Sequence, residues 1–129
     1  MKKDIRNRKD IENLVNAFYE KVKTDAILGP VFHARIMDRW PEHLEKMYNF
    51  WQTVLLGEHT YYGSPFPPHA SLPIHHGHFV RWMELFTATA DDLFSGEKSD
   101  EAKWRAGKMA EMFESKIAHY RSMGLKNLV

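Results

Sequence analysis

The sequence contains no cysteine. This absence excludes a disulfide framework, zinc sites built from thiolates, cysteine-ligated iron–sulfur clusters and the covalent attachment of a c-type haem. Any metal or prosthetic group must therefore be held by other side chains. The chain has eight histidines, and these are the first candidates for such a ligand.

Long apolar runs and an excess of charge of one sign are also absent. A transmembrane helix requires about 18 consecutive apolar residues, and no such run occurs, including after the charged residues 1–6. The 18 basic and 17 acidic residues give a formal charge of +1 and are scattered along the chain. We therefore expect a cytoplasmic protein that neither spans a membrane nor binds nucleic acid.

Alternating apolar and polar residues, the pattern of a strand, are not found, nor is an internal repeat. The 129 residues suit one domain around one core, spanning 1–129. Apolar residues instead recur at helical spacing in four segments, which predicts an all-α fold. The predicted helices are one through Ile11–Val22 that ends before Gly29-Pro30, one from Pro41 to Leu56 with Gly57 as its stop, one from His76 to Ser95, and one from a Ser99 cap to a stop at Gly124.

Two of these helices have unusually broad apolar faces. On the second helix, neighbouring stripes cover most of the circumference, which predicts a position between packing partners or between a partner and a cofactor. The second helix carries His43, Met47, Phe50 and Val54 on one stripe and Leu44, Tyr48, Trp51 and Leu55 on the other. The third helix is expected to bury Phe79, Trp82, Met83, Phe86, Ala90, Leu93 and Phe94.

The segment from Gly57 to Pro73 has 17 residues, with two glycines, four prolines and no periodic pattern. Loops longer than about 12–15 residues in a compact domain usually have a function. His69 is the most chemically capable residue of this loop, and it directly follows Pro67-Pro68. We expect it either on one short helical turn that fixes its ring or, as the ordinary alternative, in solvent.

His43 and His69 lie on either side of Phe50-Trp51 in the sequence. This arrangement predicts a ligand clamped between two imidazoles, and haem is the best candidate because a neutral imidazole is the usual protein ligand of haem iron. The alternative for His43 is a core-edge histidine bonded to a backbone carbonyl. Two other classes of protein also stay open: a non-haem metal site built from His75, His76 and His78, and a helical interaction module whose aromatic residues are core.

Several short motifs make the sequence resemble a group III truncated haemoglobin over nearly its whole length. The chain also has no Gly-Gly pair, a feature that the other two truncated groups generally carry at helix corners. The resemblance implies a two-over-two α-helical sandwich around a haem of the b type. The matching motifs are Phe18-Tyr19-Glu20, Leu28-Gly29-Pro30-Val31-Phe32, Trp40-Pro41-Glu42-His43, Asn49-Phe50-Trp51, Leu55-Leu56-Gly57, Tyr62-Gly63-x-Pro65, His69-Ala70-x-Leu72-Pro73 and Phe79-x-x-Trp82.

The resemblance also implies roles for individual residues. His69 takes the position of the proximal iron ligand, and the distal positions that stabilise a bound ligand go to Tyr19, His43 and Trp82. Whether His43 also ligates ferric iron stays open, and a high-spin ferric spectrum at neutral pH would contradict it. The residues expected to contact the haem are Phe32, His43, Met47, His69, Phe79 and Trp82, and basic candidates for its propionates are Lys46, His78 and Arg81.

A globin of this kind is expected to bind oxygen, nitric oxide, carbon monoxide or peroxide. Tyrosine and tryptophan donors favour the negative charge that bound oxygen acquires, by about 1 kcal/mol each, so oxygen would leave slowly. Slow release suits a carrier poorly and favours an enzyme that acts on the bound ligand, by nitric oxide dioxygenation or peroxide handling. No reductase domain is expected in this chain, so an external reductase would supply electrons; oxygen storage is the alternative function.

Overall fold

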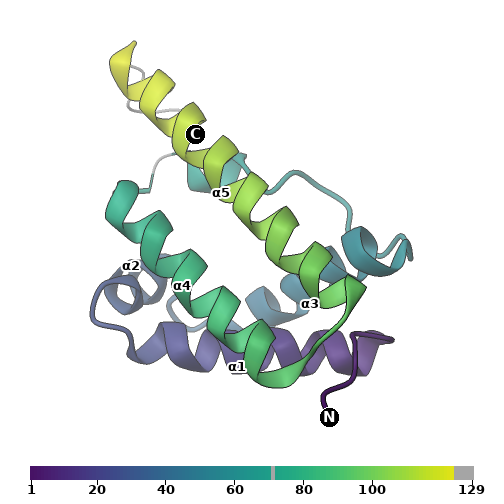
Figure 1. The fold of residues 1–129 in the computed structure, drawn as a ribbon. Helices are drawn as coiled ribbons and strands as arrows, with labels where there is room; N and C mark the ends of the chain where they lie inside the picture. The colour runs from purple at the N-terminus through teal and green to yellow at the C-terminus, as the bar shows by residue number, and fades with distance from the viewer. Residues whose placement is uncertain (71, 124–129) are drawn as a thin grey trace.

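The computed structural model describes residues 1–70 and 72–123, and the regular elements of that part are all helical (Figure 1). The all-α prediction is therefore confirmed. No helix of the same residues is long and apolar enough to cross a membrane. In chain order the elements are α1 (Arg8–Thr24), α2 (Leu28–Ile36), α3 (Trp40–Leu56), the 3-10 turn η1 (Pro67–His69), α4 (His76–Leu93) and α5 (Glu97–Ser122).

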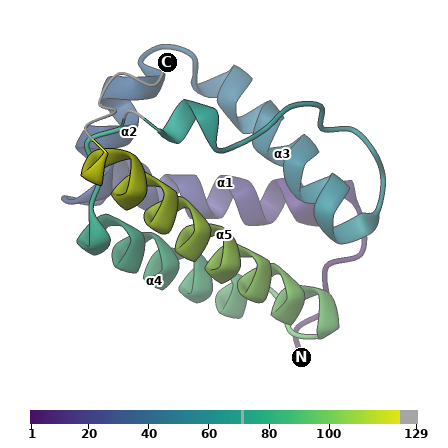
Figure 2. The same ribbon diagram turned by 90° about the horizontal axis from the view of Figure 1, so that it is seen from above.

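The four long helices form two packed pairs. Helices α4 and α5 lie side by side in both views, and α1 contacts α3 on the other side of the molecule (Figures 1 and 2). Helix α1 also packs against α4 and α2, which joins the two pairs. Between them, the rings of Trp51 and Phe86 stack with centroids 5.2 Å apart. Apolar stripes on all four long helices are thereby buried against one another.

Helix α1 forms as its sequence predicts. The Asn7 side chain accepts a hydrogen bond from the backbone N–H of Asp10 at 3.0 Å, which satisfies one of the donors at the start of the helix. The apolar residues expected on one face of this helix are all buried, namely Ile11, Leu14, Val15, Phe18 and Val22. Tyr19 lies within this face and is 6% exposed.

The four principal helices that were expected are present as α1, α3, α4 and α5, but the nine-residue helix α2 was not predicted. Gly29-Pro30 was expected to stop the first helix, but α1 already ends at Thr24. The pair lies in the first turn of α2, where a proline is tolerated because its missing N–H would have no helical partner. Asp25 starts the helix by accepting hydrogen bonds from the backbone N–H groups of Ile27 and Leu28, at 3.0 and 2.9 Å. A Cβ at Gly29 would lie 3.0 Å from the Lys23 carbonyl oxygen, so the absence of a side chain permits a close approach to α1.

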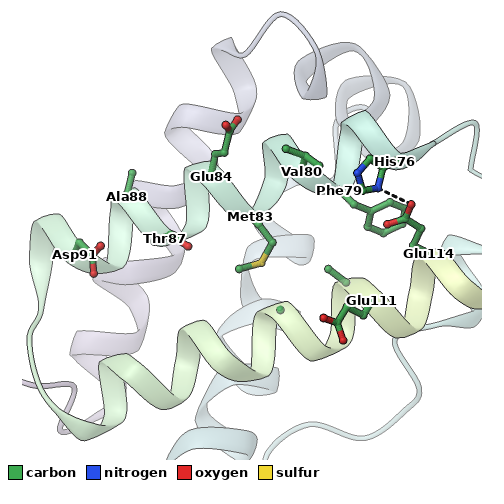
Figure 3. A pocket seen from close by; sticks show the side chains of 12 residues that line it. His76, Phe79, Val80, Met83, Glu84, Thr87, Ala88, Asp91, Glu111 and Glu114 are labelled. Carbon is green, nitrogen blue, oxygen red and sulfur yellow. Dashed lines mark hydrogen bonds and ion pairs between the residues drawn. The ribbon is translucent and has the colours of Figure 1, made fainter.

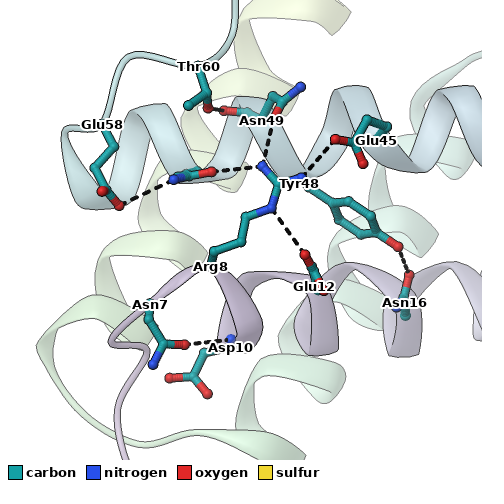
Figure 4. Close-up of polar contacts among 11 residues, drawn as sticks. Asn7, Arg8, Asp10, Glu12, Asn16, Glu45, Tyr48, Asn49, Glu58 and Thr60 are labelled. Atoms are coloured by element: carbon teal, nitrogen blue, oxygen red, sulfur yellow. Dashed lines mark hydrogen bonds and ion pairs between the residues drawn. The ribbon is translucent and has the colours of Figure 1, made fainter.

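Helix α3 ends as predicted at Gly57, whose φ of 70° is the left-handed conformation typical of glycine at this position. Along its middle and its carboxyl-terminal half, the helix is tied to α1 by Arg8 (Figure 4). The Arg8 guanidinium donates to Asn49 Oδ1 at 2.7 Å, to Gln52 Oε1 at 2.8 Å and to Glu45 Oε1 at 2.9 Å. This network fixes the position of α3 relative to α1 from outside the core.

Helix α4 begins at His76 as predicted but ends at Leu93, earlier than the expected Ser95. Leu93 was expected to point inward and is 38% exposed, so this expectation is wrong. The physical reason is that the chain becomes extended at Phe94, and Phe94 turns into the core in its place.

Helix α5 does not begin at a Ser99 cap. It begins at Glu97 after Gly96, and Ser99 is buried inside its first turn. The capping group is Asp4, near the start of the chain, whose carboxylate accepts hydrogen bonds from the backbone N–H groups of Lys98 and Ser99, both at 2.9 Å. Gly96 has a φ of 146°, and a Cβ there would lie 2.5 Å from Asp4 Cγ. The predicted stop at Gly124 lies outside the described residues.

Candidate functional site

A cavity of about 760 Å³ lies among the helices and the loop that leads to η1. Its volume is within the range of about 300–1,000 Å³ that small-molecule and cofactor pockets occupy. Every one of the helices α1 to α5 contributes to its wall, so the cavity exists only in the folded protein. All the residues predicted from the sequence to contact a haem or its ligand line this cavity, namely Tyr19, Phe32, His43, Met47, His69, Phe79 and Trp82.

His69 lies at the end of η1, which confirms the short helical turn and not the solvated loop. Its Nδ1 is 2.5 Å from the carbonyl oxygen of Pro65, and its ring centroid is 4.8 Å from that of Phe113. Burial and the nearby charge of Arg35 lower the pKa of His69 despite this hydrogen bond, so the ring is neutral near pH 7. In the tautomer that donates Nδ1–H to a carbonyl, Nε2 keeps a lone pair that can bind a metal ion.

His43 lies in the first turn of α3 and faces the same cavity. Its Nε2 is buried and has no hydrogen-bond partner among the described residues. Burial, with smaller contributions from the charges of His69 and Lys46, lowers the pKa of His43 to about 4. Buried polar atoms without a partner are uncommon in folded proteins, so this nitrogen points to a ligand in the cavity rather than to the backbone carbonyl of the ordinary alternative.

Tyr19 and Trp40 bracket His43. The Tyr19 ring meets the imidazole edge to face with centroids 5.1 Å apart, and the Trp40 ring does so at 5.9 Å. Burial raises the pKa of Tyr19, so its hydroxyl keeps its proton and can act as a donor at all ordinary pH values. Trp40 was not predicted to belong to this cluster, although it directly precedes Pro41-Glu42-His43 in the sequence.

Trp82 reaches the cavity from α4. Its indole ring stacks on Phe86 with centroids 5.5 Å apart and an angle of 13°, and it meets Phe18 edge to face at 5.5 Å. These contacts fix the plane of the indole ring, and with it the direction of its N–H group. The structure therefore brings donors from α1, α3 and α4 to one cavity.

The loop before η1 adds a residue that the sequence analysis did not single out. Tyr61 lines the cavity and packs edge to face on Phe50, with centroids 5.3 Å apart. Its backbone N–H donates to Thr53 Oγ1 at 2.9 Å, as does that of Thr60 at 3.0 Å. The long loop is thus attached to α3, a contact that no local sequence signal predicts.

Two of the three basic residues considered for the propionates line the cavity. Lys46 and His78 do so, whereas Arg81 does not. The Arg81 guanidinium instead donates to Asp25 Oδ1 at 2.7 Å, so its charge is already compensated. Two other arginines, Arg35 and Arg39, line the cavity.

The histidines at the start of α4 do not form a metal site. His75 Nδ1 accepts from the backbone N–H of Gly77 at 3.1 Å, and His78 Nδ1 accepts from that of His75 at the same distance. His76 Nδ1 instead lies 2.8 Å from Glu114 Oε2. Across residues 1–70 and 72–123, no group of three metal-binding side chains is present. Helix capping therefore accounts for the Nδ1 atoms of His75 and His78.

The residues of the cavity fit a haem group. A haem is flat and largely apolar and needs one neutral imidazole on its iron, and the cavity offers aromatic walls and the Nε2 lone pair of His69. The buried and unbonded Nε2 of His43 is a suitable neighbour for a molecule bound to such an iron.

The chain matches the bacterial-like globin family over residues 4–117. It is 35% identical to the group 3 truncated hemoglobin of Campylobacter jejuni over 124 residues, which are 93% of this chain and 98% of that protein. The crystal structure of the group III truncated hemoglobin from Campylobacter jejuni superimposes with a TM-score of 0.83, covering 91% of this chain and 95% of that one at 35% identity.

Fold and site thus define a bacterial-like globin, and the chain belongs to that family. Within it, the chain is a group III truncated haemoglobin. Membership of the family implies that the protein binds haem and, through it, gaseous ligands such as oxygen. The arrangement of α1 and α3 over α4 and α5 is the two-over-two sandwich of the truncated globins.

Proposed function

We propose that residues 1–129 act as one globin domain that holds haem b without a covalent bond. The chain has no cysteine to form a thioether, and His69 Nε2 is the group oriented to ligate the iron. Phe32, Met47 and Phe79 would pack against the haem, because they line the same cavity. Arg35, Arg39, Lys46 and His78 are basic residues of the cavity lining that could meet its propionates.

The proposed function is redox chemistry on a ligand derived from oxygen, either nitric oxide dioxygenation or peroxide handling. Haem supplies a redox-active iron that binds diatomic ligands and peroxide. The observation that carries the proposal is the convergence of Tyr19, His43 and Trp82 on one cavity, with His43 Nε2 unbonded to the described residues. Each hydrogen bond from such a donor stabilises a partly negative bound ligand by about 1 kcal/mol. The ligand therefore dissociates more slowly, which leaves time for reaction.

The electron balance of nitric oxide dioxygenation requires a partner. Oxygen and nitric oxide would combine to nitrate, and since O2 + NO + e⁻ gives NO3⁻, each turnover would consume one electron. The side chains of this cavity supply hydrogen bonds and apolar walls but no electrons. An external reductase is therefore part of the proposed function.

The test mixes the ferrous, oxygen-loaded protein with nitric oxide in a stopped-flow instrument. We expect rapid oxidation to the ferric form with one nitrate per protein, and turnover when a reductant is supplied. A companion assay measures peroxide-dependent oxidation of a phenol. If neither reaction exceeds that of free hemin, and oxygen dissociates within milliseconds, the redox function is wrong and oxygen storage is the better description.

A further inference from the structure

A second hollow, of about 690 Å³, lies on the outside of the α4–α5 pair (Figure 3). We call it the α4–α5 groove. Its floor is apolar and includes Val80, Met83 and Ala110, and Gly107 leaves room on α5 because it has no side chain. Val80 in the groove is 43% exposed, and Trp104, which lies outside the lining one helical turn before Gly107, is 61% exposed. Large apolar groups exposed together on a surface mark a site where another molecule binds.

The charges that line the α4–α5 groove are acidic. Glu84, Asp91, Glu111 and Glu114 line it, and none of the described lysines and arginines does. Two of these acids have partners across the helix pair, because Asp91 lies 2.7 Å from Lys103 Nζ and Glu114 lies 2.8 Å from His76 Nδ1. The carboxylates of Glu84 and Glu111 are 59% and 73% exposed and pair only with cations on their own helix, at 3.4 and 3.6 Å. Such exposed pairs contribute little energy, so they can exchange for cations of another molecule. Because the whole chain has a formal charge of +1, this acidic rim is a local feature.

The α4–α5 groove and the haem cavity share a wall. Phe79 and Ala110 line both of them, so these two side chains separate the groove from the cavity. A molecule seated in the groove therefore lies one layer of side chains away from the interior of the haem cavity. Electron transfer depends steeply on the thickness of protein between donor and acceptor, and this wall is thin.

We propose that the α4–α5 groove is the docking surface for the protein that donates electrons to the haem. The partner would carry lysines and arginines around an apolar centre, which would meet the acidic rim and the exposed Val80 of the groove. The proposal rests on the proposed function, which requires an external reductase. Opposite charges on two partners increase the rate of encounter and fix the orientation of the complex.

Cytochrome c serves as the probe, because it is a redox protein whose exposed haem edge is surrounded by lysines. Under anaerobic conditions the ferrous, haem-loaded globin transfers one electron to ferricytochrome c, and the rate is followed by stopped-flow absorbance at low ionic strength. In parallel, amide chemical shifts of the carbon monoxide-bound globin are recorded with ferrocytochrome c. The second measurement needs no turnover, so it reports on docking even if the proposed reactions with nitric oxide and peroxide fail.

The acidic rim is neutralised by the triple variant Glu84→Gln, Glu111→Gln and Glu114→Gln. Its matched control removes three exposed acids elsewhere, by Glu20→Gln, Asp38→Asn and Glu58→Gln. Val80→Lys is a further variant that opposes a basic partner without changing any acid. Ferricyanide oxidation of each variant checks that the reactivity of the iron itself is unchanged.

We expect the triple variant and Val80→Lys to slow electron transfer to cytochrome c by about 10-fold at low salt, with the control within about twofold of wild type. The amide chemical shifts that change on addition of ferrocytochrome c should belong to residues of α4 and α5 around Val80 and Glu111. The proposal is overturned if the triple variant and its control behave alike, if the shifts gather at the basic cavity edge around Arg35 and Lys46, or if cytochrome c does not bind at low salt.

Discussion

The phenol ring of Tyr19 and the imidazole of His43 meet edge to face, with centroids 5.1 Å apart and ring planes at 87°. The contact joins α1 to α3 at the wall of the haem cavity. Both groups are in a single protonation state near neutral pH, because burial raises the pKa of Tyr19 and lowers that of His43 to about 4. The pair therefore presents one hydroxyl donor and one neutral imidazole to a ligand.

Replacement of Tyr19 by phenylalanine should speed the release of oxygen. The change removes one hydroxyl and keeps the ring packed against His43, so we expect a dissociation rate about five- to tenfold higher, which corresponds to about 1 kcal/mol. Stopped-flow displacement of oxygen by carbon monoxide measures this rate. The matched control is Tyr48→Phe, which removes a hydroxyl bonded to Asn16 at the surface and should leave the rate unchanged. Equal rates for Tyr19→Phe and wild type would remove Tyr19 from the proposed site.

Trp82→Phe tests the indole donor in the same way. The ring contacts with Phe18 and Phe86 are kept in part, and the N–H group is lost, so we expect oxygen to dissociate several-fold faster. Trp104→Phe is the control, because Trp104 is 61% exposed and lies outside the cavity lining. If both variants release oxygen at the wild-type rate, the indole does not donate to the ligand.

His69→Ala should abolish the five-coordinate ferrous spectrum. The variant removes the imidazole that the Pro65 carbonyl orients and leaves a space of the same size, so imidazole added to the buffer should restore the spectrum. Visible absorption of the dithionite-reduced protein measures both effects. His59→Ala, an exposed residue of the same loop, should behave as wild type. A wild-type spectrum in His69→Ala without added imidazole would show that another residue ligates the iron.

Asp4→Asn should destabilise the protein by about 1 kcal/mol near neutral pH, because its carboxylate caps α5. Burial alone would raise the pKa of Asp4, but hydrogen bonds from the backbone N–H groups of Lys98, Ile5 and Ser99 outweigh it and hold the pKa below 3.8. As the pH falls, the Asp4 carboxylate therefore binds a proton at a higher pH in the unfolded chain than in the folded protein.

The stability that Asp4 contributes is thus present above its unfolded pKa of about 4 and is lost as the pH falls through its folded pKa. Urea unfolding at a series of pH values measures the difference in the free energy of unfolding between wild type and Asp4→Asn. This difference should be largest above about pH 5 and should become smaller in acid. Asp38→Asn, at an exposed position, serves as the control. A gap that does not change with pH would show that the charge of Asp4 does not stabilise the fold.

Much of the fold could be predicted because it depends on local patterns. The apolar spacing of α1 and the glycine at the end of α3 produced correct helices, since a helix buries one stripe and ends where a left-handed residue is available. The short α2 was missed because it has only nine residues and begins with an aspartate cap, a glycine and a proline that also occur in turns. Ser99 was misassigned for a similar reason: serine is a common cap, but an aspartate 95 positions earlier occupies that role.

The sequence by itself determined which residues have suitable chemistry for the site. A chain without cysteine, with His69 in a long proline-rich loop and His43 on an apolar helix, leaves few other arrangements for a haem. Only the tertiary structure decided which of these side chains are available to a ligand. Arg81 carries the same charge as Lys46, and His75 has the same imidazole as His69, but Asp25 holds Arg81 and helix α4 uses His75 as its cap. The physical reason is that burial and hydrogen-bond partners come from elements distant in the chain, and these decide whether a polar group is already satisfied or left open to a ligand.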